Sequence, residues 1–167
     1  MRYNKIRKMD ISNGPGIRVS IFVQGCTFNC KDCFNPETHN FEGGKEFCDE
    51  TMQKLMELCG KDYISGLSIL GGEPLHPNNI ATTKEIAYRF HNTYKNKNLW
   101  LWSGFQFEDI LKMEDSNILD VVDVLVDGQF KTYYKDYSLK WRGSSNQRVI
   151  DVKKSLNEKR VIELDLK

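Results

Sequence analysis

Residues 17–33 read IRVSIFVQGCTFNCKDC, an apolar run that leads directly into three cysteines. Residues 17–23 are β-branched or aromatic apart from Arg18 and Ser20, which predicts a buried strand. Cys26, Cys30 and Cys33 follow, so the loop after that strand can bring three sulfurs together. Thiolate sulfur is the ligand that iron–sulfur clusters and zinc prefer. The stretch therefore predicts a metal site at the end of a strand.

The cysteine run supplies three ligands, whereas a closed structural metal site uses four and a catalytic site keeps one position open. Two interpretations follow from the spacing alone. A zinc site could be completed by His39 or Cys48, or an iron–sulfur cluster could leave one position for another molecule.

Composition narrows the class of protein. With 167 residues, the chain is long enough for one domain with its own core. A net charge of +1 gives no electrostatic reason to expect nucleic acid or an anionic membrane as a partner. The first ten residues lack the apolar core of a signal peptide, and no run approaches the roughly 18 apolar residues of a spanning helix. We therefore expect a cytoplasmic protein. In that compartment clustered cysteines are better interpreted as metal ligands than as disulfide partners.

Strand and helix patterns alternate after residue 17. Apolar runs predict strands at 17–23, 64–70, 98–102 and 121–126. Helices are predicted from Asp49 or Thr51 to about Cys59, from Asn78 or Asn79 onward, and over 106–113. This order is typical of parallel βα units, so we expect an α/β fold.

The C-terminal part of the chain has weaker patterns. Residues 129–146 are polar and rich in Tyr and Lys, which predicts a long loop. Short apolar runs predict two more strands near 149–152 and 161–166, joined by a turn at 153–159.

Four features fall at the carboxyl ends of the predicted parallel strands, where sites of such folds lie. They are the cysteine loop, the turn Gly71-Gly72-Glu73-Pro74, the pair Ser103-Gly104 and the pair Asp127-Gly128. We expect these four segments to surround one site.

Other conspicuous residues have plain structural interpretations. Trp100 and Trp102 are two apart on a strand, which predicts that both lie on one face in the core. Cys48 and Cys59 are expected to behave as small buried apolar groups. The segment Asn13-Gly14-Pro15-Gly16 predicts a turn.

The motifs together resemble a known family. The spacing C-x3-C-x2-C is similar to the signature of radical S-adenosylmethionine enzymes. A narrower resemblance, to the anaerobic ribonucleoside-triphosphate reductase activating proteins, covers roughly residues 3–150. It is carried by DISNGPGIR, FVQGC, Phe34-Asn35-Pro36, GGEPLHP, WSGF, VDVLVDGQF and WRGSSNQ, in that order.

This resemblance implies a single radical S-adenosylmethionine domain over residues 1–167, folded as a partial, open (βα) barrel with mainly parallel strands. It implies one 4Fe-4S cluster held by Cys26, Cys30 and Cys33, with the remaining iron bound by the amino and carboxylate groups of S-adenosylmethionine. Reductive cleavage of that coenzyme would give a 5′-deoxyadenosyl radical, which removes hydrogen from a glycine Cα. The implied partners are the glycine loop of the anaerobic reductase's large subunit and an electron donor such as flavodoxin.

The resemblance also assigns the coenzyme contacts at the turn after the second predicted strand. Gly71 and Gly72 would let the backbone approach the methionyl part, where the family binds the coenzyme ammonium. Glu73 is its acidic neighbour, and Ser103 would reach the ribose or carboxylate.

The adenine side is assigned to Asp32, Cys33 and Phe34, with the Phe34 ring as an apolar wall. Many radical S-adenosylmethionine enzymes carry an aromatic residue just before the last cysteine, whereas this chain has Asp32 there and Phe34 after it.

The incoming glycine loop would be faced by Asp127 and Gln129. The resemblance places the 13–16 turn near the site entrance, where Arg18 would orient a partner.

Two alternatives come from other classes. A zinc-binding interaction module without catalysis would be colourless. An activase of another glycyl-radical enzyme, such as pyruvate formate-lyase, would share the cluster but act on a different protein. The motif WRGSSNQ and the shortness of the chain favour the reductase-activating branch.

Overall fold

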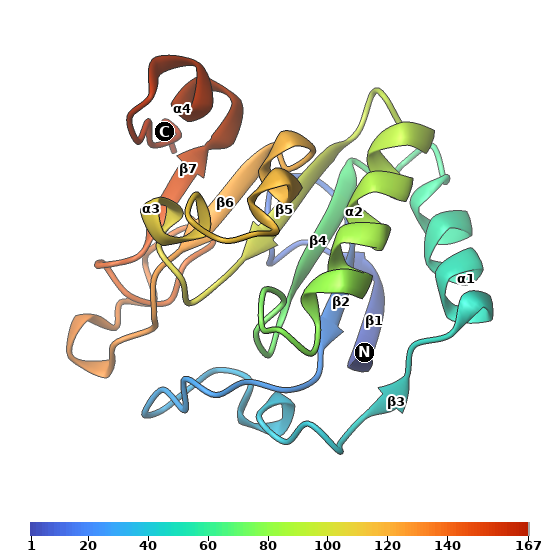
Figure 1. Ribbon diagram of the computed structural model, residues 1–167, viewed down its shortest axis with the longest axis horizontal. Helices are drawn as coiled ribbons and strands as arrows, with labels where there is room; N and C mark the ends of the chain where they lie inside the picture. The colour runs from blue at the N-terminus through green and yellow to red at the C-terminus, as the bar shows by residue number, and fades with distance from the viewer. Residues whose placement is uncertain (167) are drawn as a thin grey trace.

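The computed structural model describes residues 1–166, which form one seven-stranded open sheet in the order β3-β1-β2-β4-β5-β6-β7 (Figure 1). Lys167, the last residue of the predicted domain, lies outside the described residues. The strands are β1 Arg2–Asp10, β2 Arg18–Val23, β3 Lys45–Glu46, β4 Gly66–Gly71, β5 Asn98–Trp102, β6 Val124–Asp127 and β7 Arg148–Asp151. The α-helices are α1 Asp49–Cys59, α2 Ile80–Thr93, α3 Phe107–Ile110 and α4 Val152–Glu158. Short 3-10 helices are η1 Pro36–Thr38, η2 Ser116–Asp120 and η3 Thr132–Tyr134.

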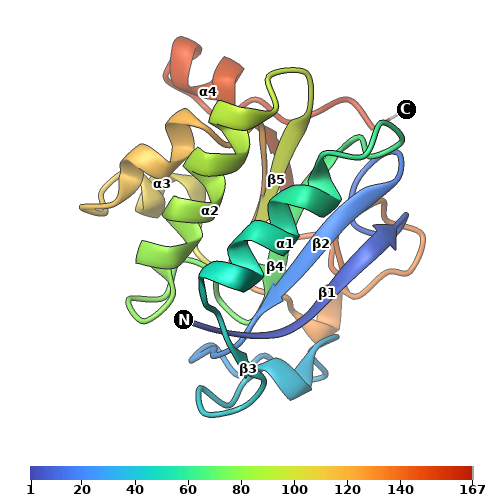
Figure 2. The ribbon, with the colours of Figure 1, turned by 90° about the vertical axis from the view of Figure 1, so that its right-hand side faces the viewer.

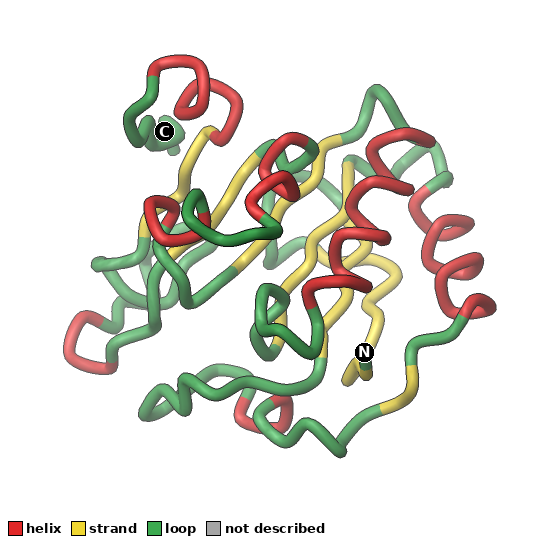
Figure 3. The backbone as a smooth tube through the Cα atoms, viewed as in Figure 1, coloured by secondary structure: helices red, strands yellow, loops and turns green. Residues whose placement is uncertain are grey.

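The centre of the sheet is parallel, as expected for an α/β fold. β2, β4, β5 and β6 pair in parallel, whereas β1, β3 and β7 join the edges antiparallel. Because parallel strands end at the same edge, the loops after β2, β4, β5 and β6 gather at one end of the sheet (Figure 3). The predicted convergence of the four segments is confirmed.

The first strand is one that the sequence patterns missed. Residues 17–23 were expected to open the sheet, but β1 precedes them and pairs antiparallel with β2. Its sequence, RYNKIRKMD, alternates few apolar residues with several charges, so it lacks the signal of a buried strand. It is stabilised by pairing with β2 and β3 and by the partial burial of Tyr3 and Ile6 against the core.

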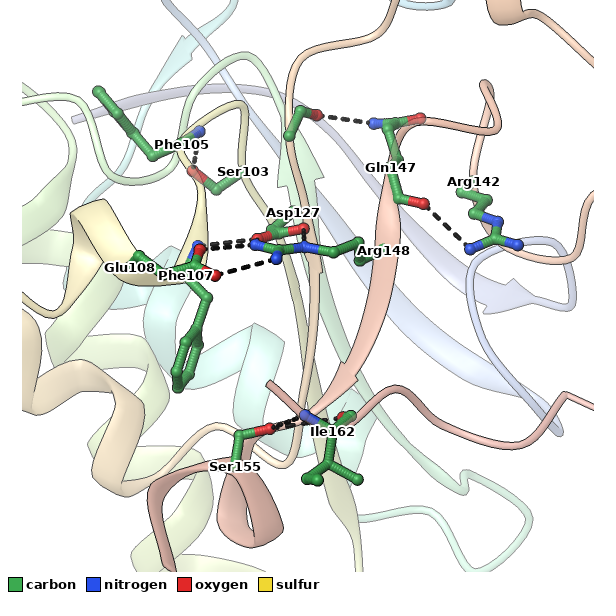
Figure 4. Close-up of polar contacts among 11 residues, drawn as sticks. Ser103, Phe105, Phe107, Glu108, Asp127, Arg142, Gln147, Arg148, Ser155 and Ile162 are labelled. Carbon is green, nitrogen blue, oxygen red and sulfur yellow. Dashed lines mark hydrogen bonds and ion pairs between the residues drawn. The ribbon is translucent and has the colours of Figure 1, made fainter. Parts of the chain in front are cut away.

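The C-terminal prediction is wrong in two places. The expected turn at 153–159 is instead α4, whose N-cap Asp151 accepts a hydrogen bond from the backbone of Lys154 at 3.0 Å. The expected strand at 161–166 is reduced to a single bridge between Ile150 and Glu163. The hydroxyl of Ser155 accepts from the Ile162 backbone N–H at 2.9 Å, which holds the helix against the segment after it (Figure 4).

Two other elements are shorter than predicted. The helix expected over 106–113 covers only α3, and the strand expected from residue 121 begins at Val124. α1 begins and ends close to the predicted positions, and α2 begins directly after the predicted start at Asn78 or Asn79.

The helices cover one face of the sheet (Figure 2). Alternate residues of the central strands point toward α1 and α2 and form an aliphatic core: Val19, Ile21, Val23, Leu67, Ile69, Leu99, Leu101 and Leu125. Successive side chains of a strand point to opposite faces of the sheet, so every second residue lies in the core when helices cover one face.

The opposite face carries aromatic and polar side chains. Trp100 and Trp102 share it as predicted, with ring centroids 5.7 Å apart, but only Trp100 is buried in the core and Trp102 is half-buried. Trp100 also packs edge-on against Trp141. Arg18 begins β2 on the same face but is fully buried, at the end of the strand far from the cysteines. The expectation that Arg18 orients a partner is therefore wrong.

Within residues 1–166, none of the helices combines the length and the apolar character needed to cross a membrane.

Candidate metal centre

A cavity of about 590 Å³ opens at the carboxyl ends of the parallel strands. Every residue predicted to bind metal or coenzyme lines it, with the exception of Asp32: Cys26, Cys30, Cys33, Phe34, Gly71, Gly72, Glu73 and Ser103. Asp32 lies in the cysteine loop, but its exposed side chain is not among the cavity walls. The predicted residues thus come together, while their roles toward a coenzyme stay predictions.

The cysteine loop turns sharply to bring its thiols to one side. Asn29 and Asp32 adopt left-handed backbone conformations with φ of 47° and 56°, which short polar residues tolerate best after glycine. The backbone N–H of Cys33 donates to the carbonyl of Cys30 at 3.2 Å, closing a tight turn between those two cysteines. All three thiols are half-buried and free of disulfides.

Backbone amides surround the sulfurs. The N–H of Asn35 donates to Sγ of Cys33 at 3.4 Å. Burial raises the pKa of Cys26 and Cys30, and backbone hydrogen bonds from Phe28 and Phe130 respectively offset part of that rise. Hydrogen bonds to cysteine sulfur are one of the means by which proteins tune iron–sulfur clusters. The donor set therefore suits a sulfur-ligated group.

Burial has the larger effect on the thiols. It raises the pKa of Cys26, to which the nearby Glu73 carboxylate adds, and burial together with Cys33 raises the pKa of Cys30. These thiols thus keep their protons until a metal displaces them, because only the thiolate is a strong ligand.

In the described part of the chain no three His, Cys, Asp or Glu side chains are grouped closely enough to hold one metal ion. In a 4Fe-4S cluster each cysteine binds a different iron atom, so its sulfurs stand farther apart than the ligands of a single ion. A loop with three half-buried thiols around a cavity fits such a cluster.

The two candidate fourth ligands of a zinc site lie differently. His39 lines the cavity, and its carbonyl accepts the N–H of Cys26 at 3.1 Å. Cys48 is exposed at the N-cap of α1 and does not line the cavity, so its predicted burial is wrong. Cys59 is buried as expected, and burial raises the pKa of its thiol to about 12.

The glycine turn after β4 lies directly against the start of the cysteine loop. The N–H of Gly72 donates to the carbonyl of Val23, and the N–H of Glu73 donates to the carbonyl of Gly25, each at 2.9 Å. A Cβ on Gly72 would stand 2.5 Å from the Gly25 carbonyl oxygen, so only glycine fits there.

Asn79 joins the same two segments, and the sequence patterns identified it only as a possible helix start. Its buried side-chain amide donates to the carbonyl of Gln24 at 3.1 Å and to that of Glu73 at 2.9 Å. An asparagine just before a helix is too common to signal such a contact from sequence.

The Glu73 carboxylate is buried and receives three hydrogen bonds. Its donors are the Leu75 N–H at 2.9 Å, the Ser103 hydroxyl at 2.8 Å and the Gly104 N–H at 2.7 Å. Burial outweighs these donors and raises the pKa of Glu73 to about 7. Glu73 thus ties the turn after β4 to the end of β5.

The end of β5 in turn packs on the cysteine loop. The Phe28 and Phe105 rings meet edge-on with centroids 4.9 Å apart, and a Cβ on Gly104 would stand 2.4 Å from the Phe28 ring. The Ser103 hydroxyl also accepts the Phe105 N–H at 3.1 Å (Figure 4). Three loops therefore interlock around the cavity through Glu73 and Phe28.

Asp127 was expected to face an incoming partner, but it is buried and does not line the cavity. Its carboxylate accepts the Phe107 N–H at 2.7 Å and is ion-paired with Arg148, which also pairs with Glu108 (Figure 4). This ion pair raises the pKa of Arg148, and its hydrogen bond to Glu108 lowers the pKa of that carboxyl. Asp127 therefore fixes β6 to β7 and α3, whereas Gln129 does line the cavity.

The predicted polar loop after β6 folds back on itself over the cavity. The Ser145 N–H donates to the carbonyl of Tyr134 at 2.8 Å, and Lys135 bridges to Ser144. Gln147, the last residue of the WRGSSNQ motif, was given no role of its own in the sequence analysis, and it fixes the base of this loop. Its side chain donates to the carbonyl of Gly128 at 3.0 Å and accepts from the N–H of Gly143 at 2.9 Å.

Comparison with known proteins agrees with the site. A family model described as a 4Fe-4S single cluster domain matches residues 12–150, which indicates an iron–sulfur cluster. The anaerobic ribonucleoside-triphosphate reductase-activating protein of Enterobacteria phage T4 is 39% identical over 149 residues, covering 89% of this chain and 93% of the phage protein. The proteins of that name from Salmonella typhimurium and Escherichia coli K12 are 38% and 36% identical over 151 residues, each covering 89% of this chain and 97% of the relative.

These matches confirm the resemblance given by the sequence motifs. They extend over most of this chain and nearly all of each relative. The chain belongs to the family of anaerobic ribonucleoside-triphosphate reductase-activating proteins.

Proposed function

We propose that this protein activates an anaerobic, class III ribonucleoside-triphosphate reductase by generating a glycyl radical on it. The observation that carries the proposal is the position of Cys26, Cys30 and Cys33 on one loop, lining a cavity with the glycine turn after β4. The names of the relatives supply the class of partner.

In this proposal the three cysteines hold a 4Fe-4S cluster and leave its remaining iron to S-adenosylmethionine. When bound, the reduced cluster supplies the electron that cleaves the coenzyme to methionine and a 5′-deoxyadenosyl radical, which takes a hydrogen atom from a glycine Cα. No general base or nucleophile of this chain is needed for that reaction.

The residues of the chain position the reactants and exclude water. Gly71 and Gly72 line the cavity, and in this proposal their backbone contacts the methionyl end of the coenzyme. Their lack of side chains lets the turn pack closely against the backbone of Phe22 and Gly25, which fixes its position in the cavity wall. Phe22, Leu70 and Trp102 form an apolar wall of the cavity. Such a wall suits a carbon radical, which must meet its glycine before it meets another hydrogen source.

The fold in this proposal is the partial, open (βα) barrel of radical S-adenosylmethionine enzymes. Its support is the group of four parallel strands with the cysteine loop at their carboxyl ends. A protein electron donor, such as flavodoxin, would reduce the cluster. The cytoplasm is the expected compartment, because all five cysteines are free.

The test is glycyl-radical EPR. The protein is reconstituted anaerobically with iron and sulfide, then mixed with dithionite, S-adenosylmethionine and the anaerobic reductase of the same organism. We expect a glycyl-radical signal on the reductase and one 5′-deoxyadenosine for each radical formed, and neither with the Cys26→Ala variant. No signal with the reductase, or a signal only with a pyruvate formate-lyase in a parallel sample, would contradict the proposal.

A further inference from the structure

Aromatic side chains gather on the surface beside the cavity. Of the eight large apolar or aromatic side chains that residues 1–166 leave exposed, four are on two adjoining loops, the loop after β6 and the cysteine loop: Phe34, Tyr133, Tyr134 and Tyr137. We name these four the tyrosine patch. Tyr133 is 91% exposed and Tyr137 is 82% exposed. Clusters of exposed aromatic side chains are more common at sites of interaction with other macromolecules than on the rest of a protein surface.

The patch is held in place by contacts within it. The Lys135 ammonium lies 5.0 Å from the centroid of the Phe34 ring and 4.8 Å from that of the Tyr137 ring. The rings of Tyr133 and Tyr134 meet edge-on at 5.1 Å. A preformed aromatic surface loses little conformational entropy when a partner binds to it.

The patch is also tied to the cysteine loop. The Thr132 hydroxyl donates to the carbonyl of Lys31 at 2.7 Å, and the Phe34 ring packs against Phe130 with centroids 5.1 Å apart. Figures 1 and 2 both show the orange loop after β6 and the blue cysteine loop at the same end of the sheet. The patch is therefore continuous with the wall of the cavity, which includes Phe34 and Tyr137.

Lysines lie on the two loops that carry the patch. Lys31 and Lys131 are exposed, and Lys135 is half-buried against two aromatic rings of the patch. The same loops carry two exposed aspartates, Asp32 and Asp136, and hydrogen bonds from the hydroxyl and N–H of Ser138 lower the pKa of Asp136 and keep it charged. These three lysines against the two aspartates leave a small positive excess, which suits an acidic partner surface.

We propose that the tyrosine patch and its lysines are the docking surface for the reductase, through an acidic, partly apolar region that flanks the glycine to be activated. This inference rests on the proposed function. The reductase is favoured over the electron donor because it must insert a segment of chain into the cavity. A segment that enters there passes Phe34 and Tyr137, whereas an electron donor needs only to approach the cluster.

The test changes exposed residues that do not line the cavity. The variants are Tyr133→Ala, Lys131→Glu and the two combined, with Tyr63→Ala as the matched control. Tyr63 is 56% exposed in the connection between α1 and β4, at the opposite end of the parallel strands. Affinity for the reductase is measured anaerobically by calorimetry with cluster-loaded protein and S-adenosylmethionine.

We expect the combined variant to bind the reductase at least tenfold more weakly, with a smaller dependence of affinity on salt, because the most exposed tyrosine of the patch is lost and a rim charge is reversed. Iron content and coenzyme cleavage with dithionite in the absence of reductase should equal those of wild type. Tyr63→Ala should bind within twofold of wild type.

The inference would be overturned if the combined variant bound the reductase as tightly as wild type, or if Tyr63→Ala weakened binding equally. Unchanged reductase binding with slower flavodoxin-driven cleavage would assign the patch to the electron donor and overturn it as well. Failure of the proposed function has a separate signature, because wild type would then neither bind the reductase nor cleave the coenzyme with dithionite.

Discussion

The two ends of β2 use buried polar chemistry in opposite ways. At its start, the guanidinium of Arg18 is fully buried and donates to Ser68 Oγ and Asn98 Oδ1 at 2.7 Å each, and to the Leu67 carbonyl at 2.9 Å. After its end, the thiols of the cysteine loop are half-buried around a cavity. The buried charge at the start of β2 therefore has hydrogen-bond partners within the chain. The thiols after its end face a cavity in which they can bind a ligand.

This difference separates residues that maintain the fold from residues that supply chemistry. A charge that is buried with its partners within the chain has little left to offer a substrate. Glu73 lies at the carboxyl end but resembles Arg18, since its carboxylate receives three donors of the chain. We therefore expect Glu73 to position the loops of the site, in addition to any contact with the coenzyme.

The largest effect is expected at the cysteine end. Cys26→Ala, Cys30→Ala or Cys33→Ala should each lose cluster iron to background after anaerobic reconstitution and abolish radical formation, while circular dichroism stays near that of wild type. Iron and sulfide analysis checks this, with Cys48→Ala as the control that keeps its cluster. An intact cluster in any of the three variants would contradict the claim that the cysteine loop after β2 holds the cluster.

At the other end, Arg18→Ala should unfold the protein more easily without removing any ligand. The loss of the guanidinium leaves buried acceptors on Ser68 and Asn98 unpaired, which costs about 3 kcal/mol in free energy of unfolding. Urea denaturation measures this cost. Arg89→Ala, which removes an exposed arginine paired with Glu85 on α2, should change the same quantity by less than about 0.5 kcal/mol. Equal losses of stability in the two variants would show that the buried contacts of Arg18 contribute no more than an exposed ion pair does.

Glu73→Gln tests the residue that resembles Arg18 within the site. At pH 5 the variant should be less stable by about 1–2 kcal/mol, because an amide cannot accept from all three donors. Wild type carries a raised pKa of about 7 in place of 4.5, so the contribution of Glu73 is greatest below pH 4.5 and is lost as the pH rises to about 7. That loss is on the order of 3 kcal/mol.

The gap between wild type and Glu73→Gln should therefore close or reverse by pH 8. Denaturant unfolding of the metal-free proteins at pH 5 and pH 8 measures it, with Glu85→Gln on the exposed side of α2 as the control. A gap that stays constant with pH would mean that Glu73 titrates at its ordinary pKa.

The smallest effect is expected for the two cysteines outside the loop. In cluster-loaded protein at pH 8, iodoacetamide should modify the exposed Cys48 and leave Cys59 intact, because burial raises the pKa of Cys59 to about 12. Mass spectrometry of peptides distinguishes the two. Modification of Cys59 at the rate of Cys48 would contradict its place in the core.

The parallel centre of the fold could be predicted because its strands are short unbroken apolar runs, such as residues 17–23, each followed by a glycine or cysteine motif. β1 could not, because RYNKIRKMD has only two apolar side chains that pack against the core, Tyr3 and Ile6, and its pairing with β2 and β3 depends on segments distant in sequence. α4 was missed since KKSLNEK has few apolar residues, and its caps act through contacts with Asp151 and Ile162.

The site divides in the same way. The cysteines and the glycine turn could be predicted because their spacing along the chain carries the information. The bonds of Glu73 to Ser103 and Gly104, and of Gln147 to Gly128, join segments that are distant in sequence. Arg18 and Asp127 were assigned to a partner because a sequence pattern does not tell whether a charge meets solvent or another part of the chain.

The most direct test of the account combines metal analysis with EPR on anaerobically reconstituted protein. We expect close to four iron and four sulfide per chain and, after reduction, an EPR signal that changes shape when S-adenosylmethionine is added. Zinc in place of iron, or a reduced cluster whose signal is unaltered by the coenzyme, would contradict the claim that three cysteines hold a cluster with one iron left open.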